Sequence, residues 1–142
     1  MKTLAKRVMC AAFALVMTAF SGVCAVASGN VVYSGAAGCG KRIAITFDDG
    51  PHPRKTAEIL DLLAERSVRA TFFVVGENAK LYPDLLMRQA AEGHEIGNHT
   101  YHHKPMKKCR DGEGKREITE TSEAIKSITG KAPVLFRPPE GS

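Results

Sequence analysis

The stretch Ile-Ala-Ile-Thr-Phe-Asp-Asp-Gly-Pro at residues 43–51 sets the structural pattern of this chain. Residues 43–47 form a short, β-rich apolar run that predicts a buried strand, and Asp-Asp-Gly-Pro predicts a turn directly after it. Apolar side chains then recur at helical spacing over residues 56–66, with Thr56 in position to cap the helix. The stretch therefore opens a unit of strand, turn and helix.

The same alternation of strand and helix recurs further along the chain. Apolar runs at residues 70–75 and 134–136 predict two more strands, and residues 95–98, with less apolar content, are a further strand candidate. Helices are expected over residues 82–92 and in a segment that ends at Gly130. Strands separated by helices indicate βαβ units and a parallel sheet. Because full β/α barrels need roughly 200 residues or more, we expect an α/β fold that is a partial (β/α) barrel, truncated after about four βα units.

The first 27 residues differ in composition from the rest of the chain. A basic head precedes an uncharged apolar run, and Ala25-Val26-Ala27 has the small-x-small pattern of a signal-peptidase site. We expect a signal peptide over residues 1–27, and hence a bacterial protein that is secreted or associated with the cell wall. The alternative is an uncleaved anchor in the cytoplasmic membrane, because the apolar run is about long enough to span a bilayer. Residues 28–40 predict a linker, which leaves residues 41–142 as the domain.

The basic character of the chain comes partly from this N-terminal segment. Without residues 1–27 the 20 Lys and Arg residues fall by three while the 15 Asp and Glu residues stay, so the formal net charge of +5 becomes +2. A charge this small is poor evidence for a nucleic-acid partner, and none is expected. Cys39 and Cys109 remain, and the sequence leaves open whether they form a disulfide outside the cytoplasm.

Three groups of polar side chains come directly after predicted strands. These groups are Asp48 with Asp49, His99 with His103, and Arg137. The carboxyl ends of parallel strands are where catalytic groups of α/β proteins gather, so the three groups should converge in space. Taken singly, the aspartates also suit an ordinary turn and the histidines a solvated loop.

Two histidines and one carboxylate make a three-ligand site with an open position, which is the arrangement of catalytic rather than structural zinc. The other aspartate then stays free as a general base, and Arg137 can keep that base ionised through a charge-assisted hydrogen bond. The remaining histidines are expected to lie outside the chemistry. His94 is expected to have a structural role beside a helix cap, His52 to be a rim residue or bystander, and His102 is assigned no role.

In series, these motifs resemble those of polysaccharide deacetylases of the NodB-homology type, carbohydrate esterase family 4. Thr-Phe-Asp-Asp-Gly-Pro at residues 46–51 is similar to the first motif of that family, and His-Thr-Tyr-His-His at 99–103 to the second. Arg-Pro-Pro-Glu-Gly at 137–141 is similar to the third. The segments at 70–76 and 93–99 are also typical of these enzymes. The motifs follow one another in the family's order and spacing.

The resemblance implies a metal-dependent enzyme that hydrolyses N-acetyl groups on amino-sugar polysaccharide, with peptidoglycan preferred and chitin-like oligosaccharide as the alternative. Asp48 is similar to the catalytic base of the family, and Arg137 to the arginine that tethers the base. The implied metal is zinc, with cobalt or another divalent ion as alternatives. The implied ligands are Asp49, His99 and His103, and the implied oxyanion-binding segment is Pro139, Glu140 and Gly141, with a backbone N–H at Glu140.

Two features depart from the family pattern. Glu140 stands where many relatives carry an aromatic residue that packs on the sugar. The later Asp-rich motif and the Leu-x-His motif, whose histidine protonates the leaving amine, do not occur in these 142 residues. One alternative is therefore an inactive fragment that retains only metal or glycan binding. Another is a different metal hydrolase, such as a phosphoesterase, that uses the same ligands. The sequence does not indicate an oligomeric state.

Overall fold

The computed structural model describes residues 42–141. The predicted signal peptide or anchor, the predicted linker and Cys39 lie outside these residues, so the expectations for them stay predictions. Within the described part, no helix combines the length and the apolar character needed to cross a bilayer. The elements in chain order are β1 (Thr46–Gly50), α2 (Lys55–Glu65), β2 (Thr71–Val74), α3 (Gly76–Leu81), α4 (Pro83–Ala91), β3 (Glu95–Asn98), η1 (Met106–Lys108), α5 (Glu113–Thr129) and η2 (Pro139–Gly141).

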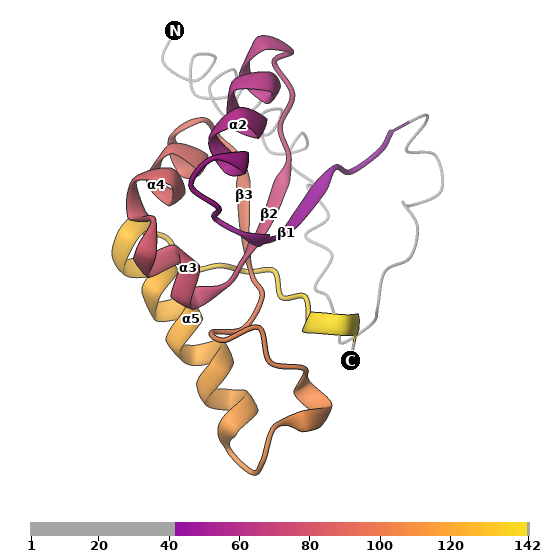
Figure 1. Ribbon diagram of the computed structural model, residues 1–142, viewed down its shortest axis with the longest axis vertical. Helices are drawn as coiled ribbons and strands as arrows, with labels where there is room; N and C mark the ends of the chain where they lie inside the picture. The colour runs from indigo at the N-terminus through magenta and orange to yellow at the C-terminus, as the bar shows by residue number, and fades with distance from the viewer. Residues whose placement is uncertain (1–41, 142) are drawn as a thin grey trace, which may run out of the picture. The chain divides into compact units, whose positions relative to one another are not determined.

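The centre of the fold is a three-stranded parallel sheet in the order β1-β2-β3. β2 pairs with β3 in regular register, from Thr71 opposite Glu95 to Val74 opposite Asn98, whereas β1 pairs with β2 across one irregularity. Figure 1 shows the helices gathered on one side of the sheet. Parallel strands connected by helices on one face are the arrangement of a partial (β/α) barrel, which confirms the predicted fold class.

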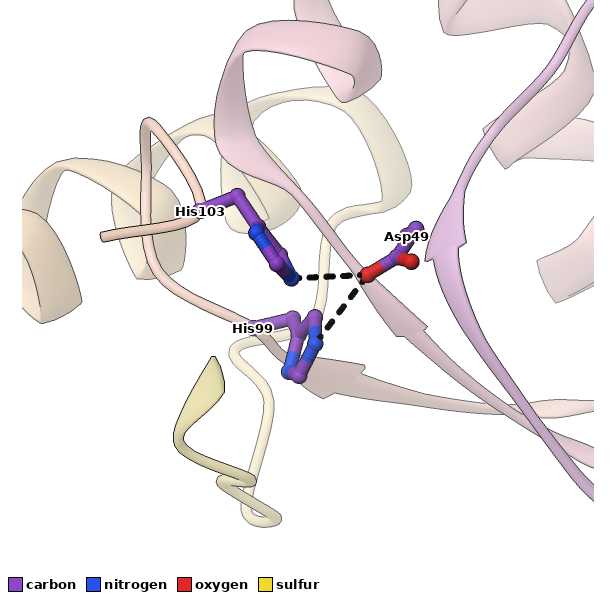
Figure 2. A group of neighbouring side chains, drawn as sticks. All are labelled: Asp49, His99 and His103. Atoms are coloured by element: carbon purple, nitrogen blue, oxygen red, sulfur yellow. Dashed lines mark ion pairs between the residues drawn. The ribbon is translucent and has the colours of Figure 1, made fainter. Parts of the chain in front are cut away.

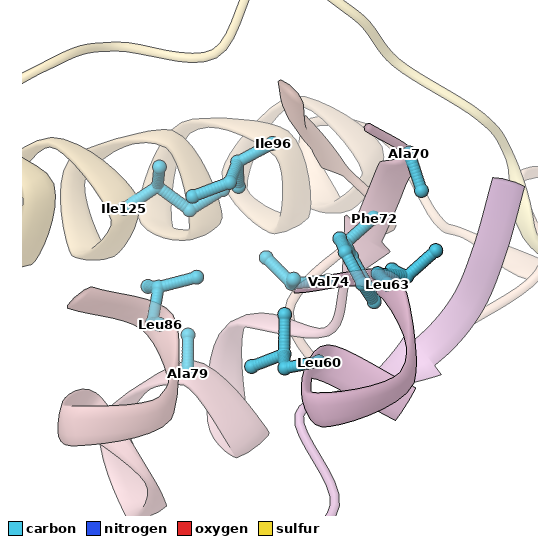
Figure 3. Close-up of a cluster of buried hydrophobic side chains, with 9 residues drawn as sticks. All are labelled: Leu60, Leu63, Ala70, Phe72, Val74, Ala79, Leu86, Ile96 and Ile125. Carbon is cyan, nitrogen blue, oxygen red and sulfur yellow. The ribbon is translucent and has the colours of Figure 1, made fainter. Parts of the chain in front are cut away.

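The hydrophobic core lies between the sheet and the helices (Figure 3). Phe72 and Val74 of β2 both belong to it, because alternate residues of a strand face the same side. The other members, contributed by all four helices, by β3 and by the residue before β2, are Leu60, Leu63, Ala70, Ala79, Leu86, Ile96 and Ile125. Burying a side chain of leucine size stabilises a fold by roughly 1.5–3 kcal/mol. Each of the helices α2 to α5 therefore contributes at least one buried apolar side chain to the core.

The opposite face of the sheet carries an aromatic ring and a cation. Phe73 of β2 packs so closely on Gly97 of β3 that a Cβ atom on this glycine would lie 2.5 Å from the ring carbon Cδ1. The guanidinium carbon of Arg137 lies 4.0 Å from the centroid of the same ring. This face thus holds a predicted site residue directly against the sheet.

The first strand lies later in the chain than the sequence predicts. β1 covers Thr46–Gly50 rather than residues 43–47. Ile43 is 88% exposed, so the apolar start of this run does not face the core. Pairing with β2 instead continues to the end of β1, where Gly50 lies opposite Val74. The two aspartates are therefore part of the strand and do not form a turn after it.

The predicted strand over residues 134–136 is wrong as a regular strand. Only an isolated parallel bridge joins Asn98 to Phe136. The N–H of Asn98 donates to the carbonyl of Leu135 at 2.9 Å, but Val134 is 78% exposed. One bridge gives this segment too few ladder hydrogen bonds to form a strand, although it still places the segment beside β3.

Glycines mark the helix ends as the sequence predicts, but the expected cap of the first helix is wrong. α4 covers Pro83–Ala91, and Gly93 follows it with a φ of 79°. Gly130, with a φ of 78°, closes α5. Both glycines supply the left-handed conformation that ends many helices. Thr56 lies inside α2, and its Oγ1 accepts the N–H of His52 at 2.8 Å instead of capping the helix.

Helix α3 is not predicted by the sequence pattern, because its six residues, Gly-Glu-Asn-Ala-Lys-Leu, show no apolar periodicity. Its first residue, Gly76, sits where the backbone approaches two other parts of the fold. A Cβ atom there would lie 2.5 Å from Cδ2 of Tyr101, 2.7 Å from Oγ1 of Thr121 and 3.2 Å from the Cα of Thr121. Only a residue without a Cβ fits this contact.

Replacing Gly76 by alanine should therefore destabilise the protein. The backbone of Thr121 belongs to α5 and cannot move aside freely, so we expect the free energy of unfolding to fall by about 1–3 kcal/mol, the usual cost of overpacking. Urea unfolding measures this. The matched control is Gly50→Ala, because the nearest heavy atom to its new Cβ would be 3.6 Å away. An equal loss in both variants would contradict the close approach at Gly76.

Candidate metal centre

A bulge in β1 places the two aspartates. Phe47 lies opposite Phe72 and Gly50 opposite Val74, so β1 takes three steps where β2 takes two. Asp49, inside this bulge, has a φ of 68°, in the left-handed region that non-glycine residues rarely adopt. Bulges re-aim side chains beside functional sites. This one gives two adjacent aspartates different partners.

Asp48 pairs with Arg137 on the face of the sheet opposite the core. Nη1 of Arg137 donates to Oδ1 of Asp48 at 2.6 Å and to Oγ1 of Thr46 at 3.0 Å. Thr46 and Asp48 are two residues apart, so they face the same side of the strand. The side chains of Arg137 and Asp48 are 38% and 36% exposed. A pair this exposed adds little stability, so its main effect is to orient the carboxylate.

The sheet ladder holds His99 in place. Its N–H donates to the carbonyl of Val74 at 2.9 Å, and its side chain is only 4% exposed. Nδ1 of its ring lies 2.7 Å from the carbonyl oxygen of Arg137. Because a carbonyl oxygen can only accept, the proton of the neutral ring is on Nδ1 and the lone pair is on Nε2. This hydrogen bond fixes the tautomer that metal-binding histidines use.

The loop of residues 99–103 brings the second histidine back toward the first. Thr100 and His103 have φ values of 67° and 56°, both in the left-handed region. Such residues cost roughly 1–3 kcal/mol each and persist only where the surrounding structure holds them. The first two residues of α3 donate their N–H groups to carbonyl oxygens of this loop at 3.0 Å each. Tertiary contacts therefore fix the direction of His103.

Asp49, His99 and His103 converge on one point (Figure 2). Oδ1 of Asp49 lies 2.9 Å from Nε2 of His103 and 3.3 Å from Nε2 of His99. One ligand atom from each residue lies within 4.8 Å of the others. Ligands that bind a tetrahedral zinc ion at about 2.0–2.2 Å lie roughly 3.4 Å apart. The donor set, its spacing and the His99 tautomer thus fit a divalent ion.

The third motif lies in η2 and in the segment before it. Glu140 has a φ of 56°, and its carboxylate oxygens lie 3.9 Å from the ammonium groups of Lys107 and Lys108 in η1. Pro139 is buried, and the N–H of Gly141 donates to a carbonyl three residues earlier at 3.2 Å. The structure thus pairs the Glu140 side chain with cations. The role of its backbone N–H toward an oxyanion stays a prediction.

Two of the remaining histidines have structural contacts. Nδ1 of His52, which is exposed, accepts the N–H groups of Arg54 and Lys55 at 3.3 Å as α2 begins. His94 is buried, and its Nδ1 accepts the N–H of Ala70 at 3.2 Å. The His94 ring therefore contacts the backbone before β2 and, as expected, lies outside the group formed by Asp49, His99 and His103.

Two residues beside the triad of Asp49, His99 and His103 were not predicted from the sequence. Glu117 of α5 is buried, and its Oε1 lies 2.7 Å from Nδ1 of His102, to which no role was assigned. The signal in the sequence was an acid on the same helical face as Thr121 and Ile125, four and eight residues later. An acid in the buried stripe of an amphipathic helix indicates a specific partner.

Comparison with known proteins shows the family of this chain. The family model described as polysaccharide deacetylase matches residues 35–142. The chain belongs to the polysaccharide deacetylase family. The match includes all three motifs and begins inside the predicted linker of residues 28–40.

Known polysaccharide deacetylases are similar to most of the domain. A peptidoglycan-N-acetylglucosamine deacetylase from Bacillus cereus is 46% identical over 99 residues, which are 70% of this chain and 36% of the relative. A chitooligosaccharide deacetylase from Rhizobium leguminosarum bv. trifolii is 53% identical over 87 residues, which are 61% of this chain and 40% of the relative. The chain spans well under half the length of these relatives.

Among solved structures, a family 4 acetyl xylan esterase from Clostridium thermocellum in complex with a cobalt ion superposes with a TM-score of 0.67. It is 37% identical, and the match covers 70% of this chain and 49% of that one. Polysaccharide deacetylases of this family use a divalent metal. In residues 42–141, the acidic and histidine side chains grouped closely enough to hold one are Asp49, His99 and His103.

Proposed function

We propose that this chain is part of a secreted, metal-dependent enzyme that hydrolyses N-acetyl groups of amino-sugar polysaccharide. The observation that carries the proposal is the placement of two adjacent aspartates with different partners. Asp49 faces His99 and His103, whereas Asp48 is hydrogen-bonded to Arg137. One carboxylate is thereby available to a metal ion and the other to a proton.

Asp48 and Arg137 have separate roles in the hydrolysis. Asp48 is the general base, which takes a proton from water as the water oxygen attacks the acetyl carbonyl carbon. Arg137 holds the carboxylate of Asp48 in position through a charge-assisted hydrogen bond. The bond between carbon and nitrogen then breaks, which releases acetate and a free amine, and the proton taken by Asp48 balances the one that the amine gains. When bound, the metal ion supplies Lewis-acid polarisation of the carbonyl and of the water.

We propose zinc as the ion, with cobalt as the alternative. Two imidazole nitrogens and one carboxylate oxygen are the ligand types that zinc prefers at catalytic sites with an open position. Cobalt is supported by the acetyl xylan esterase, which was solved with this ion.

We propose peptidoglycan as the substrate, with chitin-like oligosaccharide as the alternative. The relatives named as peptidoglycan and chitooligosaccharide deacetylases are 46% and 53% identical to this chain, and both substrates carry N-acetylated amino sugars. The signal-like composition of residues 1–27 supports export, which favours peptidoglycan. Membrane attachment is proposed only if this segment is retained, and no nucleic-acid partner is proposed.

Acetate release tests the proposal. The full chain should release acetate from N-acetylglucosamine oligomers or peptidoglycan when zinc or cobalt is present. A chelator should abolish the release, and added metal should restore it. Turnover of a phosphate ester without acetate release would replace the proposal by a phosphoesterase. Zinc binding without either reaction would replace it by a fragment that only binds metal or glycan.

A further inference from the structure

We propose that Glu117 is a positioning residue that holds the loop of residues 99–103 in the conformation that binds metal. This inference rests on the proposed metal site and concerns a residue outside it. Glu117 lies on α5, and it is not part of the group formed by Asp49, His99 and His103.

The first observation is where Glu117 contacts the loop. Its Oε2 accepts the N–H groups of Tyr101 and His102, both at 2.8 Å. Its Oε1 lies 2.7 Å from Nδ1 of His102. The two proposed ligands of the loop are the residues at its ends, 99 and 103, so the carboxylate binds the middle of the turn between them. A shift of this turn would move both imidazoles.

The second observation is that Glu117 is a buried carboxylate. Its side chain is 7% exposed, and among residues 42–141 no lysine or arginine forms an ion pair with it. Burial alone would raise the pKa of Glu117, but the hydrogen bonds from His102 and Tyr101 outweigh burial, so the pKa lies below its ordinary value. The ionised carboxylate can only accept hydrogen bonds, and the loop supplies all three donors. The side chain is thus matched to this loop conformation.

The third observation is that the loop conformation needs outside support. Thr100 and His103 both have positive φ values, which a free loop would avoid. The N–H groups at the start of α3 bind carbonyl oxygens of the loop, and Asn98 Oδ1 accepts the N–H of Thr100 at 2.9 Å. Glu117 accepts the N–H groups of the next two residues, Tyr101 and His102. The backbone of the turn is then held from both sides, by α3 and by α5.

If Glu117 holds the turn, its substitution should weaken zinc binding and not only lower the stability of the fold. Glu117→Gln keeps the size of the side chain but replaces one acceptor oxygen by an NH2 group, so the side chain can no longer accept all three hydrogen bonds of the loop. The turn should then relax and separate the imidazoles. We expect the affinity for zinc to fall roughly 10- to 100-fold, the range found when an outer-shell partner of a metal site is lost.

The test is a zinc titration of the folded full chain against a competing chromophoric chelator. The matched control is Glu120→Gln, the same change one turn further along α5 on a side chain that is 42% exposed. Glu120→Gln should bind zinc as the wild type does. Glu117→Gln with wild-type affinity would overturn the proposal, whatever its unfolding midpoint.

A second variant covers the case in which Glu117→Gln does not fold. His102→Ala removes one contact to the carboxylate, and because the His102 side chain is 59% exposed, the fold should tolerate the change. The proposal requires zinc affinity to fall at least about tenfold, the lower end of the same range. Unchanged affinity in that variant would overturn it. Both results depend on zinc binding alone, so absence of acetate release in the wild type would count against the proposed function and not against this inference.

Discussion

Replacing Asp49 by asparagine should lower the affinity for zinc by more than the roughly 100-fold that loss of an outer-shell partner costs. The variant keeps the shape of the side chain but removes the negative charge that faces His99 and His103. The amide oxygen that replaces the carboxylate is a weak ligand for zinc. Acetate release should also fall, because less metal is bound.

Competition with a chromophoric chelator measures this change. Asp84→Asn is the matched control, because Asp84 is exposed in the first turn of α4 and the substitution is chemically the same. Its zinc affinity should equal that of the wild type. If Asp49→Asn also bound zinc normally, Asp49 would not be a ligand.

Replacing Asp48 by asparagine should slow the reaction but leave zinc binding unchanged, unlike Asp49→Asn. Loss of a general base typically costs roughly 10²- to 10⁴-fold in rate, so kcat for acetate release should fall by that amount. Zinc affinity should stay close to that of the wild type, because Asp48 is hydrogen-bonded to Arg137 and is not part of the triad. The two aspartates are adjacent in the chain, yet one change should remove the metal and the other only the reaction.

Steady-state kinetics with saturating zinc and a zinc titration of the same preparation measure the two effects together. The loss of the ion pair with Arg137 should barely change stability, because both side chains are more than one-third exposed. A fall in zinc affinity with normal kcat would show that the roles of the two aspartates are exchanged.

Much of the fold could be predicted because its core elements have strong local patterns. β3 was predicted with the bounds that the structure has, Glu95–Asn98, and the glycines that close α4 and α5 were expected. Helix α3 could not be predicted, because its six residues show no apolar periodicity and its first residue, Gly76, packs against α5 and the loop of residues 99–103. The helix propensity of a short segment does not reflect such tertiary contacts.

The errors at β1 have a different cause. The apolar run of residues 43–47 is a strand signal, but β1 begins at Thr46 and continues through a bulge at Asp48 and Asp49 to Gly50. A bulge depends on the neighbouring strand, so the sequence of β1 alone does not reveal it. The predicted strand at residues 134–136 is wrong for a related reason. A strand needs a partner along its whole length, and this segment has a single bridge.

The convergence of the site residues could be predicted from topology. Residues that follow parallel strands meet at one edge of the sheet, which is why Asp49, His99 and Arg137 were expected together. The supporting residues were harder to find. Glu117 lies on the buried face of α5, but the sequence alone does not identify its partner, the turn at Tyr101 and His102.

The most direct test of the central claim is the anomalous diffraction of a crystal of this protein grown or soaked with zinc. We predict one strong peak at about 2.0–2.2 Å from Nε2 of His99, Nε2 of His103 and a carboxylate oxygen of Asp49. Asp48 should remain bound to Arg137 and not to the ion. A peak elsewhere, or none at these three residues under saturating zinc, would contradict the assignment of this chain's metal site.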